Sequence, residues 1–249
     1  MRCSCCRANA SAPCHFQSEA VAIVAIIAKS LPALRARSPE AKDLRRTQLI
    51  DAAGQLFAKA DFDAVTIAGV AERAGVAKGT AYLYFATKET LFLELVRQEL
   101  TLWLEDLGVR LKRIRSAQPG RAVPAVIAKS LAERHDLRRL LVLLHSVIEP
   151  KVDEAALRAF KWFLRDLLIA VSQLIASRIP GITQPNAATL VLQTHALVIS
   201  LTPLASPPPV VARVMAQDAS LQPLQIDFES FLASTLTTLV RGMGTASKN

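Results

Sequence analysis

Apolar side chains recur at intervals of three and four residues along most of this chain, and no stretch alternates convincingly between apolar and polar positions. The first spacing is typical of helices with one buried face, whereas alternation is typical of strands. The pattern predicts helices over residues 38–60, 66–74, 78–85, 87–115, 125–134, 136–148, 153–179, 185–202 and 226–241. We therefore expect an all-α protein.

Local signals mark where several of these helices begin and end. Ser38-Pro39-Glu40 favours a helix start, because serine caps free amides, proline is tolerated in the first turn and an acid suits the positive end of the helix dipole. Pro180-Gly181 favours the end of the long helix before it. Loops are expected over 116–124, around Pro119-Gly120, and over a proline-rich insertion at 206–225.

The stretch from Thr66 to Lys88 predicts two short helices joined by a tight turn. Thr66 is a candidate N-cap, since its hydroxyl can accept a hydrogen bond from an exposed amide of the next turn. Gly75 favours the end of the first helix, because glycine tolerates the left-handed backbone that closes many helices. The apolar face of this first helix consists of Ile67, Val70, Ala71 and Ala74.

The second short helix covers about residues 78–85, with Ala81 and Phe85 four positions apart and facing inward. This is the layout of a helix-turn-helix, in which the second helix enters the major groove of DNA. The side chains left for that outer surface are Lys78, Gly79, Thr80, Tyr82, Leu83 and Tyr84.

These outward residues have the chemistry of a DNA-binding surface. Lysines neutralise phosphates, hydroxyl groups donate to phosphate oxygens or base edges, and Gly79 leaves room for a close backbone approach. Thr87 is a candidate N-cap that places Lys88 in the first turn of the next helix, where amides and ammonium would point at one phosphate. Arg45 either reaches the phosphate backbone or belongs to a solvated face. The candidate DNA contacts are Arg45, Thr66, Lys78, Gly79, Thr80, Tyr82, Leu83, Tyr84 and Lys88.

With the helix before it, this stretch closely resembles the headpiece of the TetR family of transcriptional regulators. The residues that carry the resemblance are Thr66, Val70, Ala71, Ala74-Gly75-Val76, Gly79-Thr80, Tyr82, Tyr84-Phe85, Lys88-Glu89 and Leu91, which span about a fifth of the chain. Three positions depart from the family pattern. Ala77 stands where a Ser or Thr cap is common, Ala81 where a larger aliphatic is usual, and Gly69 where an acid is common.

The resemblance implies three parts: an N-terminal extension over 1–37, which we expect to be disordered, a helix-turn-helix DNA-binding domain over 38–86, and a helical regulatory and dimerisation domain over 87–249. It implies that the long helix over 87–115 joins the headpiece to a helical-bundle core and transmits the state of that core by its tilt. It also implies a homodimeric repressor that binds a palindromic double-stranded DNA operator and responds to a small-molecule effector.

The last two long helices carry more apolar surface than one partner helix needs. Two such helices from each of two chains could form a four-helix dimer interface, and burial within one monomer is the alternative. The positions concerned are Leu190, Val191, Leu197, Val198 and Leu201, and Phe228, Phe231, Leu232, Leu236, Leu239 and Val240.

An effector pocket is expected among the core helices. Its candidate residues, chosen for aromatic character and position, are Trp103, His145, Phe160, Phe163 and His195. The alternative for each is a plain core position. The apolar composition of these helices favours a hydrophobic or aromatic effector.

Composition narrows the class of function. Thirty Lys and Arg against 21 Asp and Glu give a net charge of +9, which favours acidic partners such as nucleic acid or an anionic membrane surface. Residues 41–90 hold seven basic and six acidic side chains, so the DNA hypothesis depends on where a few groups lie. No phosphate-cradling loop, nucleophile elbow or H-E-x-x-H motif occurs, and no cofactor is indicated. We therefore expect a regulator and no enzyme; the alternative is a helical ligand-binding or interaction module without operator-specific DNA binding.

The four cysteines, Cys3, Cys5, Cys6 and Cys14, all precede residue 15 and stand beside His15. Their spacing matches no structural zinc pattern, so reduced thiols in a disordered tail are expected, with a metal or redox site as the alternative. The extension is either a basic arm that touches DNA or an over-extended reading frame. The longest apolar run, Ala20 to Ala28, is far shorter than the roughly 20 residues that span a bilayer. A cytoplasmic protein that inserts in no membrane is expected.

Overall fold

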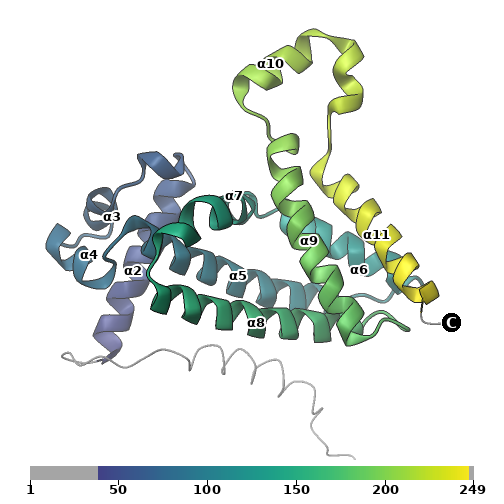
Figure 1. Ribbon diagram of the computed structural model, residues 1–249, viewed down its shortest axis with the longest axis horizontal. Coiled ribbons are helices and arrows are strands. Elements are labelled where there is room, and N and C mark those ends of the chain that lie inside the picture. The colour runs from purple at the N-terminus through teal and green to yellow at the C-terminus, as the bar shows by residue number, and fades with distance from the viewer. Residues whose placement is uncertain (1–38, 247–249) are drawn as a thin grey trace, which may run out of the picture. The chain divides into compact units, whose positions relative to one another are not determined.

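Figure 1 shows the computed structural model of the chain, which describes residues 39–246. The helices in this range are α2 (Pro39–Phe57), α3 (Ile67–Arg73), α4 (Lys78–Tyr84), α5 (Lys88–Lys112), α6 (Pro119–Ala132), α7 (His135–Leu143), α8 (Glu154–Ala176), α9 (Gln184–Ala205), α10 (Pro209–Gln217) and α11 (Phe228–Ala246). A π turn covers Leu144–Ile148, and 3-10 turns cover Phe62–Ala64, Glu149–Lys151 and Ala219–Leu224. The described residues contain no strand, which confirms the all-α class. The cysteine cluster and the extension over 1–37 lie outside the described residues.

The headpiece, formed by α2, α3 and α4, is closed by the first turns of α5. Phe57 of α2 and Phe62 of the next turn pack edge-on against Phe92 of α5, with ring centroids 5.4 and 4.7 Å apart. All three side chains are buried. Edge-to-face contacts add to the gain from apolar burial, so this aromatic cluster joins the headpiece firmly to α5.

α5 runs from the headpiece into the core and changes its neighbours on the way. It packs against α2 at one end and against α6 and α8 further along. Leu91 and Leu95 are buried, but Leu102, two turns further along the helix, is exposed. Trp103 and Leu104 are buried at that level instead, since the buried face of α5 follows its new neighbours.

The core consists of α5 to α9 and α11. α8 runs alongside α5, α9 packs on α7 and α8, and α11 packs on α6 and α9 (Figure 1). Pro180-Gly181 lies just after α8, as predicted, and Gly181 has a φ of 83° that favours glycine. The interior is almost wholly apolar.

α9 is, within residues 39–246, the one helix long and apolar enough to cross a membrane by length and composition alone. The core helix of a soluble protein passes the same test. α9 buries Ala187, Leu190 and Val198 in the fold and packs on three neighbouring helices. Its composition is therefore a weak indication of a membrane span.

Two expected loops contain helices. The loop over 116–124 is replaced by the start of α6, because Pro119 occupies the first turn, where a missing N–H is tolerated. The carbonyl of Gln118 accepts from the amides of Arg121 and Ala122, which completes that turn. The insertion over 206–225 contains α10 and a 3-10 turn.

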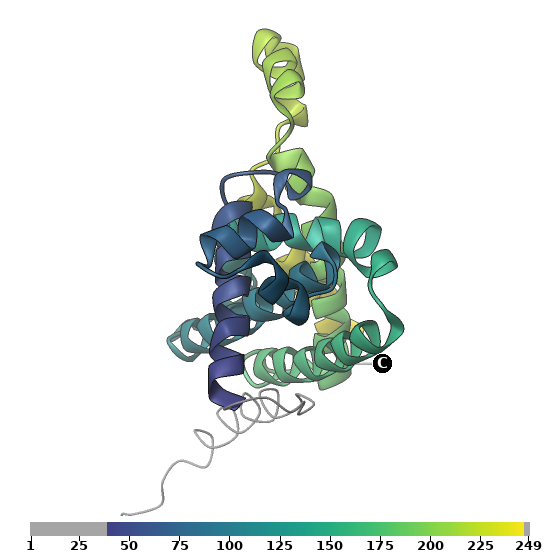
Figure 2. The same ribbon diagram turned by 90° about the vertical axis from the view of Figure 1, so that its left-hand side faces the viewer.

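α10 has no buried residue, and it projects beyond the ends of α9 and α11 in both views (Figures 1 and 2). Its apolar side chains Val210, Val211 and Val214 are exposed. A helix of this length gains little from its own hydrogen bonds. The insertion is therefore the part of the described chain that packing against the core stabilises least.

Candidate DNA-binding helix and effector cavity

α3 begins and ends as its sequence predicts. The Thr66 hydroxyl accepts from the Gly69 amide at 3.1 Å, which makes Thr66 the N-cap. Gly75 has a φ of 65°. Its amide and the next one donate back to the carbonyls of Glu72 and Ala71 at 3.1 and 2.9 Å. This pair of bonds is the Schellman motif, so the backbone itself fixes the turn that leads into α4.

α4 presents one face to the headpiece and the opposite face to solvent. Ala81 and Phe85 are buried, as the spacing predicts. On the other face Tyr82 is 47% and Leu83 is 85% exposed. Lys78 and Gly79 are also exposed, and Thr80 and Tyr84 are half-buried. A leucine exposed to this degree contributes little burial energy to the fold, so the stability of this fold does not account for Leu83.

Gly79 leaves open space at the start of α4. A Cβ added there would meet no atom within 4 Å, and the backbone φ is not in the left-handed region. Neither packing nor backbone strain therefore requires glycine within the described chain. Ala77 makes no side-chain capping bond, which fits its departure from the usual Ser or Thr.

Lys88 lies in the first turn of α5, and its ammonium is turned back into the headpiece. Thr87 is the N-cap, with its hydroxyl accepting from the Thr90 amide at 3.1 Å. Lys88 Nζ donates to the Phe62 carbonyl at 2.9 Å and lies 4.0 Å from the centre of the Phe62 ring. The ammonium is therefore bonded within the headpiece, whereas the sequence predicts that it points at a phosphate together with the first-turn amides.

The arginines near the start of α2 differ in their surroundings. Arg45 donates to Gln48 at 3.0 Å along its own helix. Arg46 pairs with Glu94 of α5 at 2.9 Å and lies 5.5 Å from the centre of the Phe85 ring. Arg46 therefore ties α2 to α5, whereas Arg45 is half-buried and, within residues 39–246, has a partner on its own helix only.

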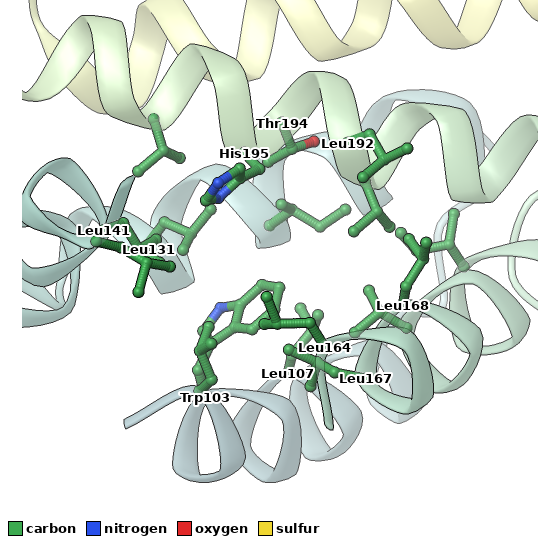
Figure 3. A pocket seen from close by; sticks show the side chains of 17 residues that line it. Trp103, Leu107, Leu131, Leu141, Leu164, Leu167, Leu168, Leu192, Thr194 and His195 are labelled. Carbon is green, nitrogen blue, oxygen red and sulfur yellow. The ribbon is translucent and has the colours of Figure 1, made fainter. Parts of the chain in front are cut away.

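An apolar cavity of about 140 Å³ lies between α5, α6, α8, α9 and the end of α7 with the π turn that follows it (Figure 3). Trp103 and His195, two of the predicted pocket residues, line it. Figure 3 shows Trp103, Leu164 and Leu167 on one side and Thr194 and His195 on the other. The full lining is Leu100, Trp103, Leu107, Ile127, Leu131, Leu141, Leu144, Leu164, Leu167, Leu168, Val171, Ile175, Val191, Leu192, Thr194, His195 and Val198.

The other three predicted pocket residues are not among the lining. Phe160 and Phe163 are buried, and the Arg97 guanidinium lies 5.9 and 4.9 Å from their ring centres. They shield a partly buried cation that pairs with Glu94 at 3.3 Å. Aromatic character alone could not separate this structural role from a ligand contact.

His145 stands behind His195 and does not line the cavity. The two Nε2 atoms are 2.9 Å apart, and the rings are nearly perpendicular. His145 Nδ1 lies 3.2 Å from Glu149 Oε2, and Lys161 Nζ donates to Glu149 Oε1 at 2.7 Å. Burial, and secondarily the neighbouring His145, lower the pKa of His195 below its usual range. The cavity thus has one polar end, backed by a chain of titratable groups.

Arg139 of α7 connects the core to the headpiece, and sequence analysis missed it. Its guanidinium donates to the Phe57 and Ala60 carbonyls at 2.8 and 3.0 Å and pairs with Asp61 at 3.2 Å. Phe57 is the last residue of α2 and Ala60 lies in the turn just after it, and cations are favourable at such a helix end. The contact joins residues about 80 positions apart, and no local sequence pattern predicts it.

Comparison with protein families agrees with this arrangement. A family model described as "Bacterial regulatory proteins, tetR family" matches residues 49–95. A second, "Tetracyclin repressor-like, C-terminal domain", matches residues 97–247, more than half of the chain. The chain belongs to the TetR family of transcriptional regulators. Its helix-turn-helix headpiece and helical C-terminal domain are therefore confirmed as parts of one family architecture.

Curated relatives of this TetR-family chain are regulators too. The fatty acid metabolism regulator protein of Bacillus subtilis (strain 168) is 33% identical over 93 residues, 36% of this chain and 47% of the relative. The HTH-type transcriptional repressor KstR2 of Rhodococcus jostii (strain RHA1) is 30% identical over 108 residues, 43% of this chain and 45% of the relative. The matched part thus spans about half the length of these relatives.

Solved structures share the fold of this TetR-family chain over most of its length. The repressor AlkX from Dietzia sp., implicated in biodegradation of n-alkanes, matches with a TM-score of 0.53 and 17% identity, covering 85% of this chain and 98% of AlkX. FadR from Bacillus subtilis in complex with stearoyl-CoA matches with a TM-score of 0.50 and 20% identity, covering 79% and 98%. At this identity the likeness establishes the fold alone.

Proposed function

We propose that this TetR-family chain is a DNA-binding transcriptional regulator, a repressor that binds a palindromic operator as a homodimer and releases it when a small apolar effector binds. The observation that carries the proposal is the division of α4 into a face buried in the headpiece and a face open to solvent. The buried face, Ala81 and Phe85, fixes the helix. The open face is then free to enter a DNA groove as a rigid element.

The open face of α4 supports major-groove binding by its chemistry. Lys78 is exposed at the start of the helix, Tyr82 and Leu83 project from its middle, and the space at Gly79 allows a phosphate to approach the backbone. Phosphate contacts give affinity and register, and base-edge contacts give specificity. Thr66, Thr80, Tyr84 and Arg45 complete the proposed contact surface. Lys88 would join it only after leaving the Phe62 carbonyl.

A homodimer through α9 and α11 supplies the second recognition helix. Their inward rows are mostly buried in the monomer, yet Leu204 of α9, at 53%, and Phe231 of α11, at 44%, remain exposed. Exposed apolar side chains on two adjacent helices suit a four-helix interface with a second copy. Two headpieces about one helical turn apart, roughly 34 Å, would then read the two halves of a palindrome.

The cavity supports an apolar effector. Fourteen of its 17 lining side chains are aliphatic, and it lies against α5, the helix that begins in the headpiece. Arg139 gives α7 a second route to the headpiece. An effector acts by binding the released state more tightly than the DNA-bound state. A role in the cytoplasm, where bacterial DNA lies, follows from the proposal.

Selection of bound duplexes from a random pool tests the proposal. A regulator of this kind recovers a motif with two-fold symmetry and half-sites about one turn apart. Its affinity for that duplex falls steeply as salt rises, because bound lysines and arginines displace counterions. Recovery of no motif, together with no salt-dependent binding of DNA, would favour the helical ligand-binding module instead.

A further inference from the structure

The effector cavity has few free polar groups. Three of its lining side chains carry a nitrogen or oxygen: Trp103, Thr194 and His195. Trp103 Nε1 donates to Ser130 at 3.0 Å, and the Thr194 hydroxyl donates to the Leu190 carbonyl at 2.7 Å. Both donors are therefore satisfied inside the fold. His195 is left as the side chain that can donate a hydrogen bond to a ligand.

The Glu149 carboxylate determines where His145 holds its proton. Because a carboxylate only accepts, His145 Nδ1, 3.2 Å from Glu149 Oε2, carries the hydrogen. A neutral His145 then has a bare Nε2, which accepts from His195 Nε2 at 2.9 Å. Protonated His145 instead donates from its Nε2. The hydrogen between the two imidazoles thus belongs to His195 in the first state and to His145 in the second.

This exchange changes what His195 offers through its other ring nitrogen. Nδ1 of His195 has no hydrogen-bond partner within residues 39–246. When neutral His195 uses its one hydrogen at Nε2, its Nδ1 is a bare acceptor. When His145 is protonated and donates, the hydrogen of neutral His195 sits on Nδ1, which becomes a donor. A single proton on the pair therefore converts the second ring nitrogen of His195, a residue that lines the cavity, from an acceptor to a donor.

The charges around the pair favour an anion as the ligand group. The groups that face His195 are His145 and Glu149, from the segment after α7, and Lys161 from α8. Glu149 and Lys161 form an ion pair and cancel. A proton on the two histidines leaves the site at one positive charge. Burial disfavours that charge in the empty cavity, and one ligand carboxylate would neutralise it through a charge-assisted hydrogen bond.

Building on the proposed function, we propose that the effector is a small monocarboxylate with an apolar body, and that its binding places one proton from solvent on the His145–His195 pair. In Figure 3 His195 lies toward Leu131 and Leu141, whereas Leu168 lies at the other end. The carboxylate meets the histidine end and the apolar body extends toward Leu168. An apolar cavity of about 150 Å³ accepts benzene, so the body is about the size of one aromatic ring.

Calorimetric titration of the full chain with 3-phenylpropionate tests this proposal, with 3-phenylpropionamide as the neutral probe of equal size. We expect the carboxylate to bind about tenfold or more tightly at pH 6 than at pH 8, and the amide to bind equally at both. Titration in two buffers of different ionisation enthalpy should show uptake of about one proton per carboxylate at pH 8. Equal pH dependence of the two probes, or no proton uptake, would overturn the proposal.

Three variants show whether the histidine pair holds the proton. His195→Leu should keep the amide site and lose both the proton uptake and the carboxylate preference. His145→Gln should lose the proton uptake. His135→Gln is the matched control, because His135 is half exposed, pairs with Asp136 and lies outside the cavity. Unchanged proton uptake in His195→Leu would contradict the assignment, and the wild-type titration decides the matter if a variant does not fold.

Failure of the ligand proposal can be distinguished from failure of the proposed function. DNA affinity is measured in parallel on a duplex recovered by the selection. Specific DNA binding without binding of either probe overturns the ligand class and leaves the regulator intact. Proton-coupled carboxylate binding without any specific DNA binding supports the ligand class and overturns the regulator.

Discussion

The outer face of α4 and the cavity at His195 differ in what holds them in place. α4 is positioned by contacts a few residues apart: the Thr66 cap, the backbone bonds at Gly75 and the Thr87 cap that follows. The cavity is assembled from α5, α6, α7, the π turn after it, α8 and α9, and the histidine pair at its polar end joins residues 50 positions apart. A site built locally is determined by its own short sequence, and a site built between helices depends on the whole core.

Disrupting the aromatic cluster that joins the headpiece to α5 should have the largest effect on stability. Phe92 is fully buried and contacts both Phe57 and Phe62. Phe92→Ala should lower the free energy of unfolding by about 3–5 kcal/mol, as measured by urea denaturation. Trp162→Ala is the control, since Trp162 of α8 is 57% exposed and lies in neither the aromatic cluster nor the proposed dimer interface. A loss below about 1 kcal/mol in Phe92→Ala would mean that headpiece and α5 are not joined through this cluster.

Substitutions on the DNA side should separate affinity from stability. Tyr82→Ala and Lys78→Ala each remove an exposed side chain, so operator affinity should fall by about 1–3 kcal/mol with an unchanged melting temperature. Lys88→Ala also removes the bond to the Phe62 carbonyl, so it should lower both the operator affinity and the melting temperature. Gel-shift titration and thermal unfolding measure the two quantities. Unchanged operator affinity in both Tyr82→Ala and Lys88→Ala would show that the wrong side chains are assigned to the DNA-facing surface.

Removing the Arg139 side chain, the second connection between the core and the headpiece, should weaken the coupling between effector binding and DNA binding. Arg139→Met removes two bonds to the end of α2, which should cost about 1–2 kcal/mol of stability. It should also reduce the drop in DNA affinity that the effector causes. Arg165→Met is the matched control, because Arg165 is exposed and, among the residues that the structure describes, pairs only with its neighbour Asp166. An equal effector response in both variants would exclude Arg139 from the coupling.

The smallest expected effect concerns Glu99 of α5, which faces the junction between the regions. Burial raises the pKa of Glu99, and Arg134 offsets this in part. A raised pKa in the folded state means that the protonated form stabilises the fold, and this contribution is lost as pH rises through that pKa. Glu99→Gln should therefore raise the melting temperature slightly at pH 7. A gain that persists at about pH 3, below the ordinary carboxyl range, would show that the charge is not the cause.

Features that depend on residues close in sequence could be predicted, and features that depend on distant residues could not. The headpiece helices, Gly75 and the caps at Thr66 and Thr87 follow from signals within one or two turns, and the TetR pattern adds the order of the parts. Lys88 was assigned from its position beside a cap, yet the carbonyl that holds it comes from Phe62, 26 residues earlier. Local rules place a side chain on an element but do not say which distant group it meets.

The core shows the limits of pattern more clearly. Trp103 and His195 were found on character and position, and Phe160 and Phe163 shared that character while packing around Arg97. Arg139 carried no signal at all, because its partners on α2 lie about 80 residues away in sequence. Apolar periodicity predicted the helices of the core but not which of their buried faces leave a space between them.

The central claim is that the outward face of α4 enters DNA, and one pair of variants tests it most directly. Leu83→Asp puts a negative charge on that face at a side chain that is 85% exposed, and Leu224→Asp puts the same charge at a 63% exposed leucine in the insertion. Fluorescence anisotropy on the selected duplex should show a loss of affinity of at least about tenfold for Leu83→Asp, through repulsion from phosphates, and none for Leu224→Asp. Equal affinities in two variants that melt like the wild type would contradict the account.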